Sequence, residues 1–469
     1  MTASTEAEDL GQVPEPGSAG SADGLSSATP IQAPLGTKDV LWPESARWEA
    51  LIALFRSIVT RAGFGLLVSP AFEDVRLFRR GIGDENEVVG KEMYEFADRS
   101  GRRLALRPEG TASVVRAYVQ HRPPTPWKAW YATQAFRYER PQAGRYRQHH
   151  QLGVEAVGVA DPEMDLEVIE LAHQLYRSVG LSRVTLRLNT MGCSLCRPAF
   201  IEALLAYLSS RSGQLCGAHA DTFAANPLRV LDCKKDECRA VTSEAPRLAG
   251  LLCDECSAHF ASVRDGLDAL GIEYLLDERL VRGFDYYTRT TFEFQAESLT
   301  SAQSAIGGGG RYDGLVEAIG GPPTPAVGFG VGIERLLLAC DAEGCFEVPG
   351  PAPQVFVVDL TGGKLARDIA RELRREGLRV SRSYENRSMR SQLRQADRSG
   401  ATLAVIVGPE EAAGSSATLR ELRQPSHQPS RQPSRQESVS RSELADRVLE
   451  LLGNATTDVL DVTAGEGMP

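Results

Sequence analysis

One segment, residues 127–157 (WKAWYATQAFRYERPQAGRYRQHHQLGVEAV), constrains the fold of this chain more than any other. Two runs of alternating residues flank a loop rich in Pro, Gly and Arg, a pattern that predicts an antiparallel hairpin. The expected ligand-facing residues of the two strands are Tyr131, Thr133, Ala135, Arg137 and Glu139, and His149, Gln151, Gly153 and Glu155. Charged and amide groups beside a bare glycine indicate a platform for a polar ligand, and two further loop cations, Arg145 and Arg147, favour a polyphosphate. The alternative is a solvated sheet face with scattered charges.

Bulk composition narrows the class of protein. A chain of 469 residues with 42% hydrophobic and 24% charged residues is typical of a soluble protein of two or three domains. It contains no run of about 18 apolar residues and begins with no basic-then-apolar segment, so we expect no membrane span, no signal peptide and a cytoplasmic location. The net charge of −10 argues against a simple electrostatic nucleic-acid binder. Residues 364–398, however, hold eleven Lys or Arg against five Asp or Glu, which could bind a polyanion.

Seven of the nine cysteines lie within residues 193–256. In a reducing compartment such clustering favours metal ligation over disulfides. The candidate ligands form four closely spaced pairs: Cys193 and Cys196, Cys216 and His219, Cys233 and Cys238, Cys253 and Cys256. Eight donors could build two tetrahedral sites, or four could build one, and structural zinc is the expected metal. The alternative is a set of buried free thiols.

Composition shifts divide the chain into segments. We predict a disordered tail at 1–33, a catalytic domain at 34–346 with an insertion at 190–262, a linker at 347–353, a small α/β domain at 354–452 and a tail at 453–469. The tetrapeptides RQPS, HQPS, RQPS and RQES at 423–438 are low in complexity and predict a mobile loop. A helix beginning near Pro43 precedes a strand, LLVSPAFED, and the pair could serve either a core or a dimer interface.

Three further segments carry candidate site residues. After the strand in RLALRPEGT, Glu109 and Thr111 precede a helix, with Thr111 as a candidate N-cap, and this edge could hold an ammonium group or merely cap the helix. Residues 279–294 read as a strand. Alternating glycines at 328, 330 and 332 clear one strand face for a flat ligand, and a helix follows near Ile333.

These pieces together resemble the class II aminoacyl-tRNA synthetases, and specifically the histidyl-tRNA synthetase family. The matching words are LRPEGT, FRYERPQAGRYRQHHQLGVE, LVRGFDYYTRTTFEF, GGGRYDGLV and GFGVGIERLL. The resemblance implies an α+β catalytic domain with an antiparallel six-stranded class II sheet, a small insertion domain and a C-terminal α/β domain of the anticodon-binding type. It also implies a homodimer built partly on residues 44–74 and a two-step ligation of histidine to its tRNA through histidyl-adenylate.

The resemblance also implies roles for individual residues. Arg137 and Arg282 would flank the α-phosphate of ATP. The other implied ATP contacts are Glu139, Arg145, His149 and Arg335, with His149 and Arg335 on the two faces of the adenine and Arg145 near the outer phosphates. The implied histidine contacts are Glu109, Thr111 and Gln151 on the ammonium end, Glu155 and Tyr287 on the imidazole, and Tyr286 and Gly309 in the same cavity. His149 stands where the family has Phe, so it would stack with less apolar area and could titrate.

Mg²⁺ is expected with ATP, although no ligand for it follows from the sequence. The insertion would face the acceptor stem of the tRNA, so a metal there would support tRNA contact. Arg387, Arg390 and Arg394 recur at helical spacing and could contact phosphates of the anticodon stem, or could be a solvated helix face.

Two other functions remain possible at this stage. The first is a non-catalytic histidine-binding paralogue, the regulatory subunit of ATP phosphoribosyltransferase, which normally lacks the C-terminal domain and the catalytic arginines. The second is a tRNA-sensing module, which is normally fused to a kinase for which this chain has no room.

Overall fold

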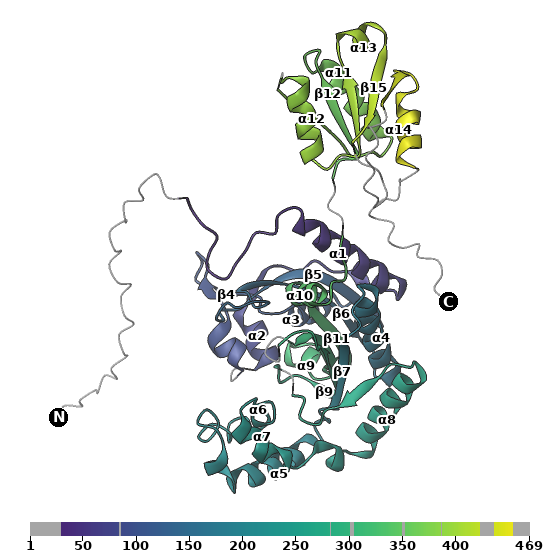
Figure 1. The fold of residues 1–469 in the computed structure, drawn as a ribbon. Coiled ribbons are helices and arrows are strands. Elements are labelled where there is room, and N and C mark those ends of the chain that lie inside the picture. The colour runs from purple at the N-terminus through teal and green to yellow at the C-terminus, as the bar shows by residue number, and fades with distance from the viewer. Residues whose placement is uncertain are drawn as a thin grey trace, which may run out of the picture.

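The computed structural model describes seven ranges of the chain: 30–83, 86–281, 283–300, 304–348, 352–385, 387–422 and 436–453. The predicted tails at 1–33 and 453–469 lie almost wholly outside these ranges. Arg282 also lies outside them. The larger unit is built on an eight-stranded sheet of order β1-β5-β6-β11-β10-β9-β7-β8 (Figure 1). Its strands are β1 (Gly65–Leu66), β5 (Trp127–Phe136), β6 (Gln148–Val157), β7 (Val184–Thr190), β8 (Tyr274–Leu276), β9 (Thr288–Ala296), β10 (Ala305–Arg311) and β11 (Ala326–Gly332).

The predicted hairpin is confirmed, with β5 and β6 as its two strands. Their antiparallel register pairs Tyr131 with Gly153, Thr133 with Gln151 and Ala135 with His149. Because directly paired residues in a sheet point to the same side, both predicted faces belong to one face of the sheet. Arg137 and Glu139 lie just beyond the end of β5.

The six inner strands of the sheet are antiparallel, as the resemblance implied. Short strands β1 and β8 extend the two edges in parallel pairs, which brings the total to eight. The strand predicted at 279–294 is wrong in its first half, since β9 begins only at Thr288. The glycine run at 307–310 is itself part of a central strand, β10. Glycine is needed there because a Cβ on Gly309 would lie 2.0 Å from the carbonyl oxygen of Gly328 on the next strand.

The opposite face of the sheet carries the main hydrophobic core. Three helices bury residues against it: α1 (Glu44–Arg61), α4 (Pro162–Ser178) and α10 (Ile333–Glu343). Trp48, Leu51 and Phe55 recur at helical spacing on α1 and are buried, as the sequence pattern predicts. Leu152, Val154 and Ala156 of β6 point into this core, so the alternate residues of β6 are left on the ligand side.

A smaller three-stranded sheet of order β2-β4-β3 stands beside the first. It consists of β2 (Phe72–Asp74), β3 (Glu95–Ala97) and β4 (Arg103–Leu106), with helices α2 (Val75–Ile82) and α3 (Thr111–His121) nearby. The single strand predicted for LLVSPAFED is therefore two short ones, β1 and β2, on either side of Pro70.

The insertion consists of short helices and turns that lie below the large sheet in Figure 1. It contains α5 (Arg197–Ser209), η2 (Ser212–Gln214), α6 (Leu228–Leu231), α7 (Asp236–Ser243) and η3 (Leu248–Leu251). The predicted boundary at residue 262 falls inside a continuous helix, α8 (Asp254–Ala269). Val263 and Leu267 of α8 are buried in the main core, so the last part of this helix belongs to the catalytic unit.

A buried ion pair connects the sheet to α4. Arg311, at the end of β10, is fully buried, and its Nε donates to Asp165 Oδ2 of α4 at 3.0 Å. His259 of α8 contacts the same carboxylate at 3.3 Å through Nε2, while its Nδ1 lies 3.4 Å from Arg289 Nη1. Burial raises the pKa of Asp165, but its hydrogen bonds and the nearby positive charges outweigh that and hold the pKa below its usual value.

The C-terminal unit is a separate five-stranded sheet of order β13-β12-β14-β15-β16. Its elements are β12 (Val355–Asp359), α11 (Lys364–Arg375), β13 (Val380–Arg382), α12 (Met389–Arg398), β14 (Leu403–Val407), α13 (Pro409–Ala413), β15 (Ser416–Glu421), β16 (Gln436–Ser440) and α14 (Leu444–Leu452). The first three strands of the sheet order are parallel, as expected, and β15 and β16 are antiparallel additions. The loop predicted at 423–438 lies mostly outside the described residues, but its last three residues belong to β16.

Among the described helices, none combines the length and apolar character needed to cross a membrane.

Replacing Asp165 by Asn should destabilise the catalytic unit by about 3–5 kcal/mol, because Arg311 would stay fully buried with only the partly exposed Asp313 as a charge partner. Urea denaturation followed by tryptophan fluorescence would measure this, since all four Trp residues of the chain precede residue 131 and report on this unit. Asp341→Asn is a suitable control, because this carboxylate pairs with Arg47 while its side chain stays 57% exposed. Equal effects of the two substitutions would contradict a structural role for the buried pair.

Candidate active site

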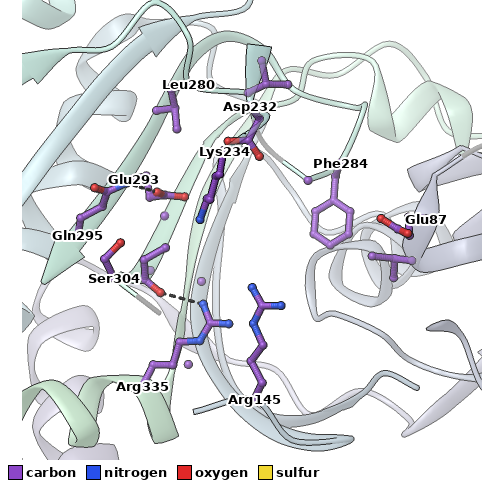
Figure 2. A pocket seen from close by; sticks show the side chains of 18 of the residues that line it. Glu87, Arg145, Asp232, Lys234, Leu280, Phe284, Glu293, Gln295, Ser304 and Arg335 are labelled. Carbon is purple, nitrogen blue, oxygen red and sulfur yellow. Dashed lines mark hydrogen bonds between the residues drawn. The ribbon is translucent and has the colours of Figure 1, made fainter. Parts of the chain in front are cut away.

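A cavity of about 1000 Å³ opens on the ligand side of the large sheet (Figure 2). Six of the residues proposed as ATP or histidine contacts line it: Arg137, Glu139, Arg145, His149, Gln151 and Arg335. They come from the loop between β5 and β6, from β6 itself and from the start of α10. The remainder of the wall includes glycines of β10 and β11 and residues of the insertion.

Arg137 is held in place by the segments on both sides of it. Its Nε donates to the carbonyl oxygen of Pro108 at 3.0 Å, and its guanidinium lies 5.5 Å from the ring centroid of Phe284. Val281 and Gly283, the two neighbours of Arg282, line the same cavity. Segments about 145 residues apart therefore meet at one cavity, although Arg282 itself is outside the described residues.

Arg335 enters the cavity from the first turn of α10. Its Nε donates to Gly144 at 3.0 Å and its Nη1 to Ala305 at 3.0 Å, both through carbonyl oxygens. The loop that supplies Gly144 is closed by paired backbone hydrogen bonds between Gln142 and Arg145. Arg145 also contacts Glu139 at 3.5 Å, so the cations of this loop and of α10 are fixed close together.

The neighbouring histidines on β6 have different environments. Removal from water, then the charges of Arg137, Arg335 and His150, lower the pKa of His149 to about 3. His149 is therefore neutral at physiological pH. The titration that the sequence suggested for this imidazole would occur only at acidic pH. His150 points away to Glu334, which accepts its backbone N–H and contacts its ring Nδ1 at 2.9 Å.

Glu155 lies fully buried at the inner end of the ligand face. Its carboxylate accepts hydrogen bonds from Thr111 Oγ1 at 2.7 Å, from the Tyr131 hydroxyl at 3.2 Å and from the Tyr312 hydroxyl. Burial is the main cause of a pKa of about 8 for this carboxyl, and the charge of Glu109 adds to it. The three hydroxyls oppose the rise because they stabilise the carboxylate.

At the start of α3 the side chain of Glu109, and not that of Thr111, caps the helix. Gly110 occupies the N-cap position, and the Glu109 carboxylate accepts the backbone N–H groups of Thr111 at 2.6 Å and Ala112 at 2.7 Å. The prediction of Thr111 as the N-cap is therefore wrong, since its hydroxyl is bonded to Glu155 instead. Gln151 Oε1 accepts the N–H of Gly110 at 3.1 Å and so ties this turn to β6.

The alternating glycines of β11 leave room mainly for side chains of the protein itself. A Cβ at Gly328 would lie 1.8 Å from Glu155 Oε2, and one at Gly330 would lie 2.2 Å from Gln151 Nε2. Gly332 alone of the three faces open space. The prediction of a whole strand face cleared for a flat ligand is thus wrong at Gly328, whereas Gly330 and Gly332 both line the cavity.

The remaining predicted residues lie near Glu155 to different degrees. The ring of Tyr286 packs against Tyr287, Tyr312 and Phe284, and Tyr287 is buried. Gly307 and Gly308 line the large cavity, whereas Gly309 packs against β11. Sequence reasoning missed Tyr312 as a partner of Glu155, and it placed Tyr131 on the right face without assigning it to the site. The bare Gly153 opposite Tyr131 was the available signal, since a Cβ there would lie 2.4 Å from the phenol ring.

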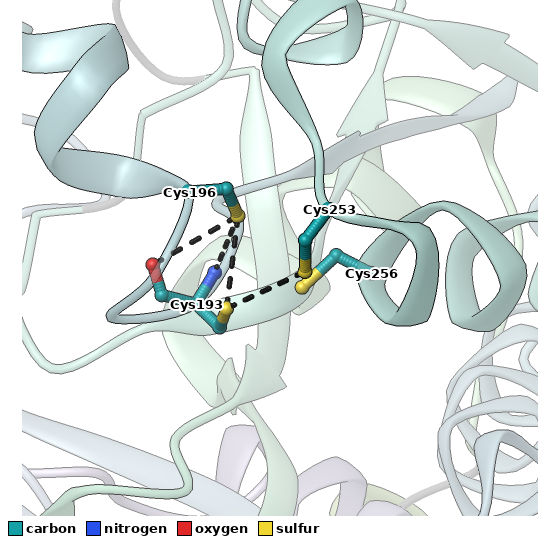
Figure 3. Close-up of side chains that lie close together, drawn as sticks. All are labelled: Cys193, Cys196, Cys253 and Cys256. Atoms are coloured by element: carbon teal, nitrogen blue, oxygen red, sulfur yellow. Dashed lines mark hydrogen bonds between the residues drawn. The ribbon is translucent and has the colours of Figure 1, made fainter.

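The cysteine-rich insertion forms two groups of four donors. Cys193, Cys196, Cys253 and Cys256 make the first cluster, with two ligands before α5 and two at the start of α8 (Figure 3). Cys216, His219, Cys233 and Cys238 make the second cluster. In each cluster the donor atoms lie within 4.8 Å of one another, so the eight predicted residues assemble as two sets.

Comparisons with known proteins agree on one family. Residues 36–336 match the family model described as histidyl-tRNA synthetase, and residues 354–451 match an anticodon binding domain. The histidine–tRNA ligase of Moorella thermoacetica is 47% identical over 83% of this chain and 93% of its own length. That of Desulforamulus reducens is 43% identical over 83% and 94%. The crystal structure of apo S. aureus histidyl-tRNA synthetase superposes with a TM-score of 0.73 and 31% identity, over 89% of this chain and 99% of that one.

Glu155→Gln should make the folded state less sensitive to pH. The raised pKa means that folded Glu155 keeps its proton between about pH 4.5 and 8 while the unfolded chain releases it, so wild-type stability falls across this window. The variant lacks this titration, and its stability relative to wild type should rise by at least about 1 kcal/mol between pH 5.5 and 8. Urea denaturation at the two pH values would measure it, and a difference independent of pH would contradict the assignment.

Proposed function

The chain belongs to the histidyl-tRNA synthetase family and ligates histidine to its cognate tRNA, and on this premise we propose how its residues divide the work. Histidine and ATP first give histidyl-adenylate and pyrophosphate, and the histidyl group then passes to the 3′-terminal adenosine of the tRNA. The observation that carries the assignment is the single cavity shared by Arg137, His149, Arg335 and both neighbours of Arg282. The C-terminal match argues against the histidine-binding paralogue, which normally lacks this domain.

Arg137 and Arg282 stabilise the α-phosphate during adenylate formation. The carboxylate of free histidine has a reference pKa near 3.5, so it is ionised at neutral pH and needs no general base. The step needs instead a fixed positive charge where negative charge develops on phosphorus. A guanidinium supplies this better than an ammonium group, because it is permanently charged and offers a planar fork of donors. The hydrogen bond from Arg137 to Pro108 holds one such fork in the cavity.

The adenine of ATP lies between His149 and Arg335, and Arg145 and Glu139 stand beside the phosphates. Neutral imidazole can stack on a base without opposing the adjacent guanidinium groups, which is consistent with the lowered pKa of His149. Mg²⁺ accompanies ATP in this family. Carboxylate oxygens at the cavity, those of Glu139 and Glu293, are the hard donors that this ion prefers, and they would hold it against the phosphates.

Histidine occupies the inner end of the site. Gln151, Glu109 and Thr111 receive its ammonium group, and Glu155 and Tyr287 hydrogen-bond its imidazole, with Tyr286 and Gly309 nearby. Glu155 is suited to this role because three hydroxyl groups fix the position of its buried carboxyl group. A site whose buried polar groups need a partner rejects analogues that lack one by about 10⁴–10⁵.

The tRNA contacts both ends of the molecule. Phosphates of the anticodon stem bind three exposed arginines, Arg387 just before α12 and Arg390 and Arg394 on it. The insertion faces the acceptor stem. The proposed division of the chain is a catalytic domain at 34–346 with the insertion inside it, a linker at 347–353 and an anticodon-binding domain at 354–452. The protein works in the cytoplasm, where its tRNA is found.

The protein is a homodimer through the N-terminal part of the catalytic domain. Large apolar side chains stand exposed in this region, which is unfavourable for an isolated monomer. They include Leu41 (71% exposed), Trp42 (57%), Val68 (83%) and Phe72 (51%).

Each cysteine cluster holds one structural zinc ion. Zinc–sulfur bonds of about 2.3 Å in a tetrahedron separate the sulfurs by about 3.8 Å. The observed Sγ–Sγ distances of 3.7 Å for Cys193–Cys196, 3.8 Å for Cys193–Cys253 and 3.9 Å for Cys216–Cys233 fit this value. A disulfide would need a distance of about 2.05 Å between the two sulfurs, so the observed spacing supports the proposal of a metal over disulfides.

ATP–pyrophosphate exchange with each of the twenty amino acids tests the function, and only histidine should support it. Arg137→Ala and Arg282→Ala should each lower the exchange rate by about 10³-fold, the scale seen for arginine fingers. Glu155→Ala should raise the KM for histidine far more than the KM for ATP. A near-normal exchange rate in either arginine variant would refute its role.

Metal analysis of the reduced protein should find two zinc ions per chain, and Cys196→Ser and Cys238→Ser should each lose one. Cys345→Ser is the matched control, because Cys345 is a free cysteine outside both clusters and its loss should leave the zinc content unchanged. Zinc below about 0.2 equivalents in the wild-type protein would reject the proposal.

A further inference from the structure

The second cysteine cluster stands at the wall of the ATP cavity. Two of its donors, His219 and Cys233, line the cavity together with Arg137, His149 and Arg335. The family resemblance implies that the insertion faces the tRNA. The position of His219 and Cys233 indicates that part of the insertion also borders the nucleotide.

The residue that follows Cys233 extends furthest in this direction. In Figure 2 the side chain of Lys234 is directed into the cavity towards Arg145 and Arg335, which enter it from the opposite side, from the loop between β5 and β6 and from α10. We propose that Lys234 is an ATP-binding residue of this enzyme and that its ammonium group contacts the triphosphate during adenylate formation. This proposal rests on the ATP site described above.

Two independent contacts fix the backbone next to Lys234. Cys233 Sγ lies 3.9 Å from Cys216 Sγ, which itself lies 3.4 Å from His219 Nδ1, so the cluster holds one side of the segment. On the other side Arg279, from the segment that precedes Arg282, donates twice to the carbonyl oxygen of Leu231, at 3.1 and 3.3 Å. The insertion is thereby attached to the catalytic unit at the position where Lys234 enters the cavity.

The cations that face one another across the cavity favour a polyphosphate as the ligand of Lys234. Arg137, Arg145 and Arg335 approach from the sheet side, and Lys234 adds a compact positive charge from the opposite wall. An ammonium group acts as a point charge towards phosphate and tolerates changes in phosphate geometry as pyrophosphate separates. ATP is favoured over the tRNA terminus because the cavity that Lys234 enters is also lined by the adenine-side residues His149 and Arg335.

The proposal is tested by ATP–pyrophosphate exchange without tRNA at saturating histidine, together with the Kd for ATP of the full chain by calorimetry. Lys234→Ala should raise both the KM and the Kd for ATP about tenfold and leave the KM for histidine unchanged. Lys234→Arg, which keeps the positive charge, should restore both constants to within about threefold of wild type.

Lys235→Ala is the matched control, since Lys235 is an equally exposed lysine that lies next to Lys234 but does not line the cavity. It should leave both constants unchanged. Unchanged ATP constants in Lys234→Ala, including the case in which only tRNA charging is impaired, would overturn the proposal and assign the residue to the tRNA. Exchange activity of the wild type with histidine reports the function itself, so the two failures are distinguishable.

Discussion

The buried carboxyl group of Glu155 is the constraint on which the catalytic face depends. A carboxyl group inside a sheet is costly unless hydrogen bonds replace its water. Here Thr111, Tyr131 and Tyr312 supply them from three different elements, so the same bonds join α3, β5 and the end of β10. Gly328 opposite the carboxylate provides the space, since any side chain there would overlap Glu155. The polar site and the packing of the sheet are therefore one arrangement, and neither can change alone.

A second polar connection runs from this site to the insertion. Tyr312 follows Arg311, whose ion pair with Asp165 continues through His259 to Arg289 and then to Glu255. Arg289 donates to His259 Nδ1, so the remaining ring proton is on Nε2 and points at Asp165. Glu255 lies between Cys253 and Cys256, the two members of the first cluster at the start of α8. Side-chain contacts from Arg311 to Glu255, together with the chain neighbours at each end, thus link the amino-acid end of the site with the first cysteine cluster.

Much of this arrangement could be predicted from the sequence, because period-two alternation fixes which residues of a hairpin share a face. Alternation predicts one site for Arg137, His149 and Gln151. The pairing of β5 with β6 confirms a common face for His149 and Gln151, and Arg137, just beyond β5, lines the same cavity. The spacing of the cysteines likewise predicted eight donors, although only the fold reveals which four belong together. What local patterns could not supply were contacts between distant segments. Tyr312 lies 157 residues from the carboxylate it donates to, and no periodicity reports such a pair. The same reason explains why the sequence did not predict the position of Lys234, or that Glu155 and Gln151 fill the space beside Gly328 and Gly330.

The first cysteine cluster also joins the two ends of the insertion. The chain leaves the sheet after β7, passes Cys193 and returns to it through Cys253, whose sulfur lies 3.8 Å from that of Cys193. The segments that lead into and out of the insertion thus lie side by side at Cys193 and Cys253, and the residues between them form a loop with closely spaced ends. A loop of this kind can gain or lose residues without moving the strands that hold it, because the cost of closing a loop grows only slowly with its length. The insertion is therefore the part of this enzyme in which sequence length is free to vary, while the sheet on which it is mounted stays constant.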